Sequence, residues 1–141
     1  MTETKKAPKP PKFKPPVKDK VTCEFGRRGD TWAAGYHTGV DYGSKSGTPV
    51  RAVSDGVIIA GSWGQAYGTQ VIIEHGAYRY IYAHLASKTP LKAGTKVLQG
   101  TVIGISGQSG SASGPHLHLE ARVAPYRYAL DAVDPRKCLH G

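Results

Sequence analysis

The sequence predicts an all-β fold, a single antiparallel sandwich or barrel-like domain with a groove between its loops, preceded by a disordered arm rich in proline and lysine. Short runs of β-branched and aromatic residues alternate with glycine-rich turns from residue 21 onward. No window shows a sustained 3.6-residue period, so long helices are not expected. The chain has 141 residues, 18 of them glycine, which is the size of one domain and not of two.

Five segments have the length and composition of strands. In chain order they are residues 56–60 (GVIIA), 70–74 (QVIIE), 79–83 (RYIYA), 101–105 (TVIGI) and 116–121 (HLHLEA). Turn-forming residues separate them, as at 61–64, 76–77 and 107–111. A single helical turn could form over residues 126–132, before Asp134 and Pro135 end it.

The arm comprises residues 1–20 and the folded domain residues 21–141. The arm holds seven lysines against Glu3 and Asp19, so it carries more than half of the net charge of +9. It also holds five of the ten prolines and one aromatic residue, Phe13. Such a segment buries too little apolar surface to offset the entropy lost on ordering it, and we expect a disordered or polyproline-II conformation.

Composition argues against several classes of protein. No apolar run approaches 18 residues, so no membrane span is expected. No apolar segment follows Lys5 and Lys6, which argues against a secretory signal. The basic residues of the domain are scattered among acidic ones rather than clustered with aromatics, so no specific nucleic-acid site is expected.

The chain has six histidines, and two of them share a strand. In the alternating segment 116–120, the imidazoles of His116 and His118 point to one face of the strand, about 6.6 Å apart. This spacing suits one histidine as a metal ligand and its neighbour as a second group of the same site. His75 and His140 are expected to be ordinary surface or core residues, and His84 taken alone is ambiguous.

A histidine and an aspartate lie four residues apart at His37 and Asp41. In an extended chain their Cα atoms would be about 13 Å apart, too far to share one ion. Glycines and a β-branched residue make a helix unfavourable here, so we expect a bend at Thr38-Gly39. Two imidazoles and one carboxylate are a ligand set typical of catalytic zinc, with a fourth position open.

At this point the sequence resembles the lysostaphin-type (LytM-like) zinc endopeptidases, which cleave peptide bonds in bacterial peptidoglycan. The resemblance covers most of residues 22–136 and rests on ordered motifs: His37-x-x-x-Asp41, 47–50 (GTPV), 55–57 (DGV), Tyr67-Gly68, 82–85 (YAHL), Gly94-x-x-Val97, Gly104-x-x-Gly107 and 113–120 (SGPHLHLE). It implies that His37, Asp41 and His118 bind one zinc ion per chain. It implies also that His84 and His116 are the catalytic pair, and which of them is the base stays open.

The resemblance further implies a substrate groove. Glycine- and serine-rich loops at 62–70 and 106–113 could wall it, with Trp63, Tyr67 and Ser113 as candidate contacts. Some relatives carry a tyrosine six residues before the first ligand to stabilise the oxyanion, whereas this chain has Thr31 there. Tyr36 is the candidate substitute for that role.

The expected activity is hydrolysis of stem or cross-link peptides of peptidoglycan by a monomer, with the arm attracted to anionic wall polymers or serving only as a tether. Residues 66–70 (AYGTQ) replace the triple-glycine loop of relatives that cut glycine bridges, so the sequence favours D-alanyl cross-links. Without a signal peptide, release at lysis or association with a phage particle is the expected route to the wall. The alternatives are a non-catalytic wall-binding or structural module of a phage particle and, as a weaker option, a phosphocarrier-like domain.

The two cysteines, Cys23 and Cys138, stand at the two ends of the domain. If the ends of the fold lie together they could form a disulfide, which would stabilise the fold by several kcal/mol in the chain-entropy model. Two buried thiols are the equally weighted alternative.

Overall fold

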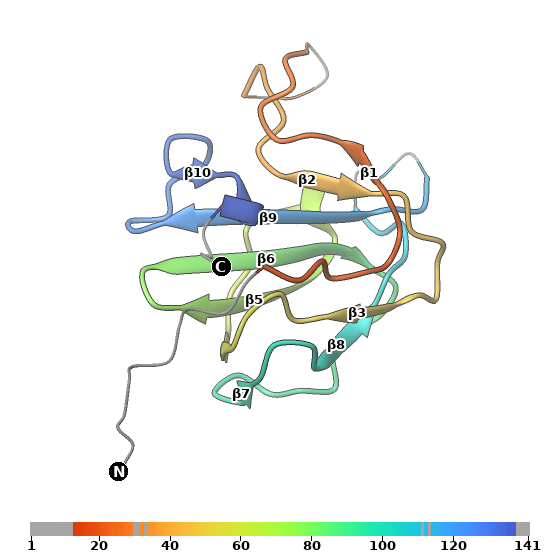
Figure 1. Ribbon diagram of the computed structural model, residues 1–141, viewed down its shortest axis with the longest axis vertical. Helices are drawn as coiled ribbons and strands as arrows, with labels where there is room; N and C mark the ends of the chain where they lie inside the picture. The colour runs from red at the N-terminus through yellow and green to blue at the C-terminus, as the bar shows by residue number, and fades with distance from the viewer. Residues whose placement is uncertain (1–12, 30–31, 33, 111, 113, 138–141) are drawn as a thin grey trace.

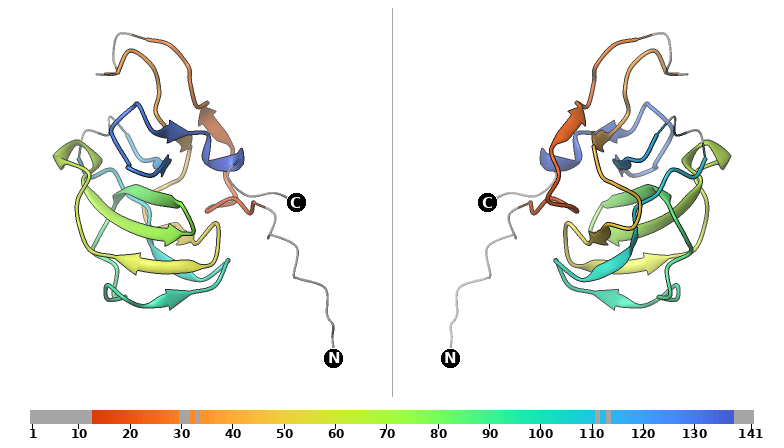
Figure 2. Two further views of the ribbon diagram at one scale, coloured as in Figure 1. Left: turned by 90° about the vertical axis from the view of Figure 1, so that its left-hand side faces the viewer. Right: turned by 90° about the vertical axis from the view of Figure 1, so that its right-hand side faces the viewer.

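The computed structural model describes residues 13–29, 32, 34–110, 112 and 114–137. In this part of the chain an eight-stranded antiparallel sheet dominates, in the order β1-β2-β9-β6-β5-β4-β7, and β10 also pairs with β9 (Figure 1). Its strands are β1 (Val21–Cys23), β2 (Val40–Tyr42), β4 (Gly56–Ile59), β5 (Thr69–His75), β6 (Tyr78–Leu85), β7 (Lys96–Val97), β9 (Leu117–Val123) and β10 (Ala132–Val133). In the side views, β4 and β7 lie at the end of the sheet opposite β1 and β2 (Figure 2).

One face of the sheet is the hydrophobic core. Because side chains alternate along a strand, Leu117 and Leu119 of β9 lie on this face, opposite Tyr42 and Val40 of β2. Tyr82 of β6 joins them from the other side of β9 and is fully buried. The intervening residues of the same strands therefore point to the opposite face.

A second sheet of two strands, β3 (Pro49–Arg51) and β8 (Val102–Ile105), covers the core face. Val50 and Ile103 are fully buried in the same cluster as Tyr82. The hydroxyl of Tyr82 accepts a hydrogen bond of 2.9 Å from the backbone N–H of Val53, just after β3. The predicted all-β antiparallel fold is confirmed, as two packed layers.

The five predicted strands are present as β4, β5, β6, β8 and β9. The remaining strands are two or three residues long, too short to show an alternation in sequence. Residues 128–131 form a hydrogen-bonded turn, in which the backbone carbonyl of Arg127 accepts from the Asp131 N–H at 3.1 Å. This turn takes the place of the helical turn that the sequence allowed over residues 126–132. Two short 3₁₀ helices, η1 (Gln65–Tyr67) and η2 (Pro135–Lys137), complete the described elements, none of which is a helix long and apolar enough to cross a membrane.

The structure differs from the predicted boundary at residue 20. Val17 is 5% exposed within the core cluster, and Phe13 packs against that cluster. The carbonyl of Pro16 accepts a hydrogen bond of 2.8 Å from the Arg51 N–H. Residues 13–20 therefore pack on the domain, because two apolar side chains and a backbone partner offset the cost of ordering them; residues 1–12 lie outside the described part.

Candidate active site

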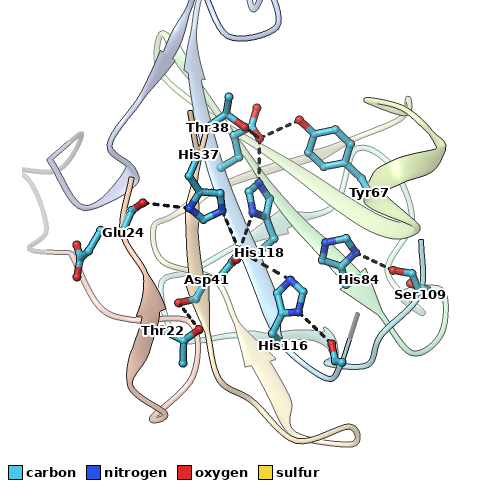
Figure 3. A network of polar contacts seen from close by, with 12 residues as sticks. Thr22, Glu24, His37, Thr38, Asp41, Tyr67, His84, Ser109, His116 and His118 are labelled. Atoms are coloured by element: carbon cyan, nitrogen blue, oxygen red, sulfur yellow. Dashed lines mark hydrogen bonds and ion pairs between the residues drawn. The ribbon is translucent and has the colours of Figure 1, made fainter. Parts of the chain in front are cut away.

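The face of the sheet opposite the core gathers the predicted metal ligands (Figure 3). Asp41 of β2 is directly paired with His118 of β9 in the sheet register. The Oδ1 atom of Asp41 lies 2.8 Å from Nδ1 of His118 and 3.2 Å from Nε2 of His37. One carboxylate oxygen thus joins both imidazoles, and the three residues meet as predicted.

Hydrogen bonds on the far side of each ring determine which nitrogen is free. Nδ1 of His37 lies 3.1 Å from the carbonyl oxygen of Glu24, which can only accept, so this nitrogen carries the proton. Nε2 of His118 lies 2.9 Å from Oε1 of Glu120 and donates to it. When the His118 ring is neutral, the lone pairs of His37 Nε2 and His118 Nδ1 are therefore directed toward Asp41.

This donor set fits a divalent cation. Two imidazole lone pairs and a carboxylate oxygen that face one another repel unless a positive charge lies between them. In the metal-free protein a proton supplies it: burial disfavours the charged imidazole of His118, but its hydrogen bonds with Asp41 and Glu120 outweigh burial and raise its pKa to about 9. Burial likewise opposes ionisation of Asp41, yet the hydrogen bond from the protonated His118 holds its pKa well below the ordinary value.

The two predicted catalytic histidines lie beside this cluster. The rings of His84 and His116 are 4.7 Å apart, and Nε2 of His116 is 3.9 Å from Oδ1 of Asp41. Nδ1 of His84 donates to the carbonyl of Ser109 at 2.7 Å, and Nδ1 of His116 donates to that of Gly114 at 3.0 Å. When neutral, both rings therefore present an unprotonated Nε2 that can accept a proton.

His84 is held neutral by its surroundings. Burial lowers its pKa to about 4, although the hydrogen bond to Ser109 works in the opposite direction. Its backbone has a φ of 60°, which is unusual for a residue other than glycine. This conformation ends the regular pairing of β6 with β9, which runs as far as Ala83 opposite His118.

Residues 35–135 match the family model of peptidase family M23. The chain belongs to peptidase family M23. It is 41% identical over 116 residues to the DD-carboxypeptidase/endopeptidase Mpg of Neisseria meningitidis serogroup B, an alignment that covers 79% of this chain and 26% of the relative. The M23 chain described here thus spans about a quarter of the length of that curated relative.

Solved structures agree with this membership. The catalytic domain of the antimicrobial peptidase lysostaphin from Staphylococcus simulans has a TM-score of 0.73 and 35% identity, over 83% of this chain and 89% of that one. A zinc-containing peptidase from Vibrio cholerae has a TM-score of 0.74 and 30% identity, over 91% of this chain and 40% of that one. The resemblance seen in the sequence is confirmed at the level of family and fold.

A buried polar network supports His118, one of the predicted ligands. Oε1 of Glu120, a residue with no exposed surface, accepts hydrogen bonds from His118, from the hydroxyl of Thr38 at 2.8 Å and from the hydroxyl of Tyr67 at 2.8 Å. Its other oxygen accepts from Nε of Arg122 at 2.9 Å. This network was missed as a functional unit, yet the alternation that pairs His116 with His118 continues to Glu120 and Arg122 and could have revealed it.

The predicted bend between His37 and Asp41 occurs at Gly39. A Cβ atom at this position would lie 2.7 Å from Cε1 of His118, closer than real side chains approach one another. Glycine is therefore required because the Leu119 carbonyl oxygen and the His118 ring of β9 both come so near to the backbone, and not for a left-handed conformation.

The predicted substrate contacts have different surroundings. The Tyr67 hydroxyl is used within the Glu120 network, and Trp63 lies over the guanidinium of Arg122 at 3.9 Å. The hydroxyl of Tyr36 donates to the carbonyl of Ala129 at 2.7 Å. Ser113 lies outside the described residues, and contacts of all four with a substrate stay predictions.

A pocket of about 220 Å³ lies over β4 and β5, and none of the predicted ligands or predicted catalytic histidines lines it.

Cys23 lies beside two of the predicted ligands: one possible ligand atom each from Cys23, His37 and Asp41 lie within 4.8 Å of one another. Cys138 is outside the described residues, so the disulfide stays a prediction.

Proposed function

We propose that this M23 domain is a zinc-dependent endopeptidase that hydrolyses peptide bonds of bacterial peptidoglycan. The observation that carries the proposal is the convergence of His37 Nε2, Asp41 Oδ1 and His118 Nδ1 beside two imidazoles with unprotonated Nε2 atoms. Zinc held by the three ligands would supply a Lewis acid that polarises the scissile carbonyl and favours ionisation of water. The zinc content of the Vibrio cholerae structure supports this choice of metal.

The two remaining histidines would move the protons of the reaction. His84 holds a proton poorly at neutral pH, since its pKa is about 4. We therefore assign the role of general base to His116, whose Nε2 is 3.9 Å from Asp41 and accepts the proton of the attacking water. As the carbonyl oxygen of the scissile bond becomes negative, the N–H at Nε2 of His116, which now carries the proton from water, would stabilise that oxygen or deliver the proton to the leaving amine.

The D-alanyl cross-link is the proposed scissile bond. The relative Mpg is named a DD-carboxypeptidase/endopeptidase. The loop at residues 66–70 (AYGTQ) also supports this choice, because it lacks the triple glycine of the relatives that cut glycine bridges. Release of this enzyme at lysis, or its association with a phage particle, is a hypothesis that rests on the sequence alone.

Digestion of defined cross-linked muropeptide dimers tests the proposal. Mass spectrometry should show monomers released by scission at D-alanine, with no release after chelation and recovery on adding zinc. The variant His118→Ala should bind the wall but release nothing. Full activity of the chelated protein, or wall binding without release by the zinc-loaded wild type, would contradict an enzymatic role.

A further inference from the structure

A β-bulge in β1 directs Cys23 toward the metal ligands. Val21 is paired with Tyr42 and Cys23 with Asp41, so two residues of β1 advance the pairing by only one residue of β2. Strict alternation would place Val21 and Cys23 on the same face. Val21 packs on the hydrophobic core, opposite a core residue, while the bulge brings Cys23 opposite the ligand Asp41.

The sulfur of Cys23 thereby lies beside atoms of the kinds that can bind a metal ion. Ligand atoms of Cys23, His37 and Asp41 lie within 4.8 Å of one another. The paired row continues across the sheet, because Asp41 is in turn opposite His118. Thiolate is a preferred ligand of zinc, which takes four ligands when a site is structural and keeps one position open when it is catalytic.

We propose that Cys23 is a fourth protein ligand of this metal site and that its thiolate holds the site in a latent state. The inference rests on the metal site of the proposed function. On binding, the thiol loses its proton to solvent and the sulfur bonds to the metal, with no change of oxidation state. The position needed for catalysis is then filled, and the sulfur must leave before a peptide can be cleaved.

Cobalt(II) is the probe for this ligand, because a cobalt–thiolate bond produces a charge-transfer absorption band in the near ultraviolet. Fully reduced protein, with both thiols confirmed by titration, is loaded with one equivalent of cobalt under argon. We expect the band in the wild type and in the matched control Cys138→Ser. We expect its complete loss in Cys23→Ser and Cys23→Ala.

Zinc affinity and cleavage give two further readouts. Loss of the Cys23 ligand should weaken zinc binding by at least about 10–100-fold, which is the typical effect of losing a residue that only hydrogen-bonds to a metal ligand. With zinc saturating, Cys23→Ser should release muropeptides faster than the reduced wild type. Equal release rates would overturn the latent state.

Alkylation of the wild type keeps the inference testable if the Cys23 variants do not fold. Stoichiometric zinc should slow modification of Cys23 by iodoacetamide, with Cys138 of the same chain as the internal reference in peptide mass spectrometry. Cobalt bound without the band, or no protection by zinc, would overturn the role of Cys23 while leaving the three-ligand site intact. Failure to bind cobalt at all would instead overturn the metal site of the proposed function.

Discussion

The substitution Glu120→Gln removes one charge from the buried network without changing its shape. Glu120 has no exposed surface, and its two oxygens together accept four hydrogen bonds, three of them at Oε1. The amide oxygen of glutamine can replace Oε1 toward His118. The NH₂ group of the glutamine must then face Nε of Arg122, so that two donors oppose each other, and the buried side chain of Arg122 loses its negatively charged partner.

The expected cost follows from these contacts. Removing one partner of a buried ion pair usually costs about 3–5 kcal/mol, because the other charge stays buried. A domain of ordinary stability, about 5–15 kcal/mol, survives this loss. Since the carboxylate also orients the His118 ring, zinc affinity should fall about 10–100-fold.

Urea denaturation of the metal-free protein and chelator competition for zinc measure the two effects. The matched control is Glu74→Gln, which breaks an ion pair of the same 2.9 Å length with Arg79 in which the side chains are 37% and 33% exposed. That exposed pair should contribute less than about 1 kcal/mol and leave zinc affinity unchanged. If Glu120→Gln proves no more harmful than its control in either assay, the network has no supporting role.

Three other predictions concern the same site. The variants His116→Ala and His84→Ala should keep stoichiometric zinc but lower kcat by about 10²–10⁴-fold in the muropeptide assay, and a loss below tenfold would argue against a proton-transfer role. Because the folded-state pKa of His118 is raised from 6.5 to about 9, its contribution to metal-free stability is complete below pH 6.5 and lost as the pH rises to about 9. Zinc competes with that proton, so zinc affinity should rise about tenfold per pH unit across this window, and a flat profile would contradict the assignment. Gly39→Ala should destabilise the fold by about 1–3 kcal/mol and weaken zinc binding, because the new Cβ would clash with the Leu119 carbonyl oxygen and lie 2.7 Å from the His118 ring. Unchanged denaturation and zinc titration curves would show that the backbone moves to accommodate it.

The longer strands and their faces could be predicted from local pattern. The alternation over residues 116–121 predicted that His118 points away from Leu117 and Leu119, and in β9 the two leucines lie in the core while His118 is paired with Asp41. The sequence predicted that residues 13–20 are disordered, because the proline and lysine content of the whole arm is high. Their packing on the domain depends instead on two individual side chains, Phe13 and Val17, which a composition does not reveal.

What the sequence by itself determined was the all-β class, the bend near Gly39 and the residue types of the candidate metal site. These follow from a two-residue period and from chemistry that adjacent residues already contain. The tertiary structure alone decided the pairing of Asp41 with His118 across 77 residues. It also decided the proton positions of three histidines, which depend on carbonyl groups of Glu24, Ser109 and Gly114, and the bulge that turns Cys23 toward the proposed ligands. Strand register and hydrogen-bond partners are set by contacts between distant segments, and no local period encodes them.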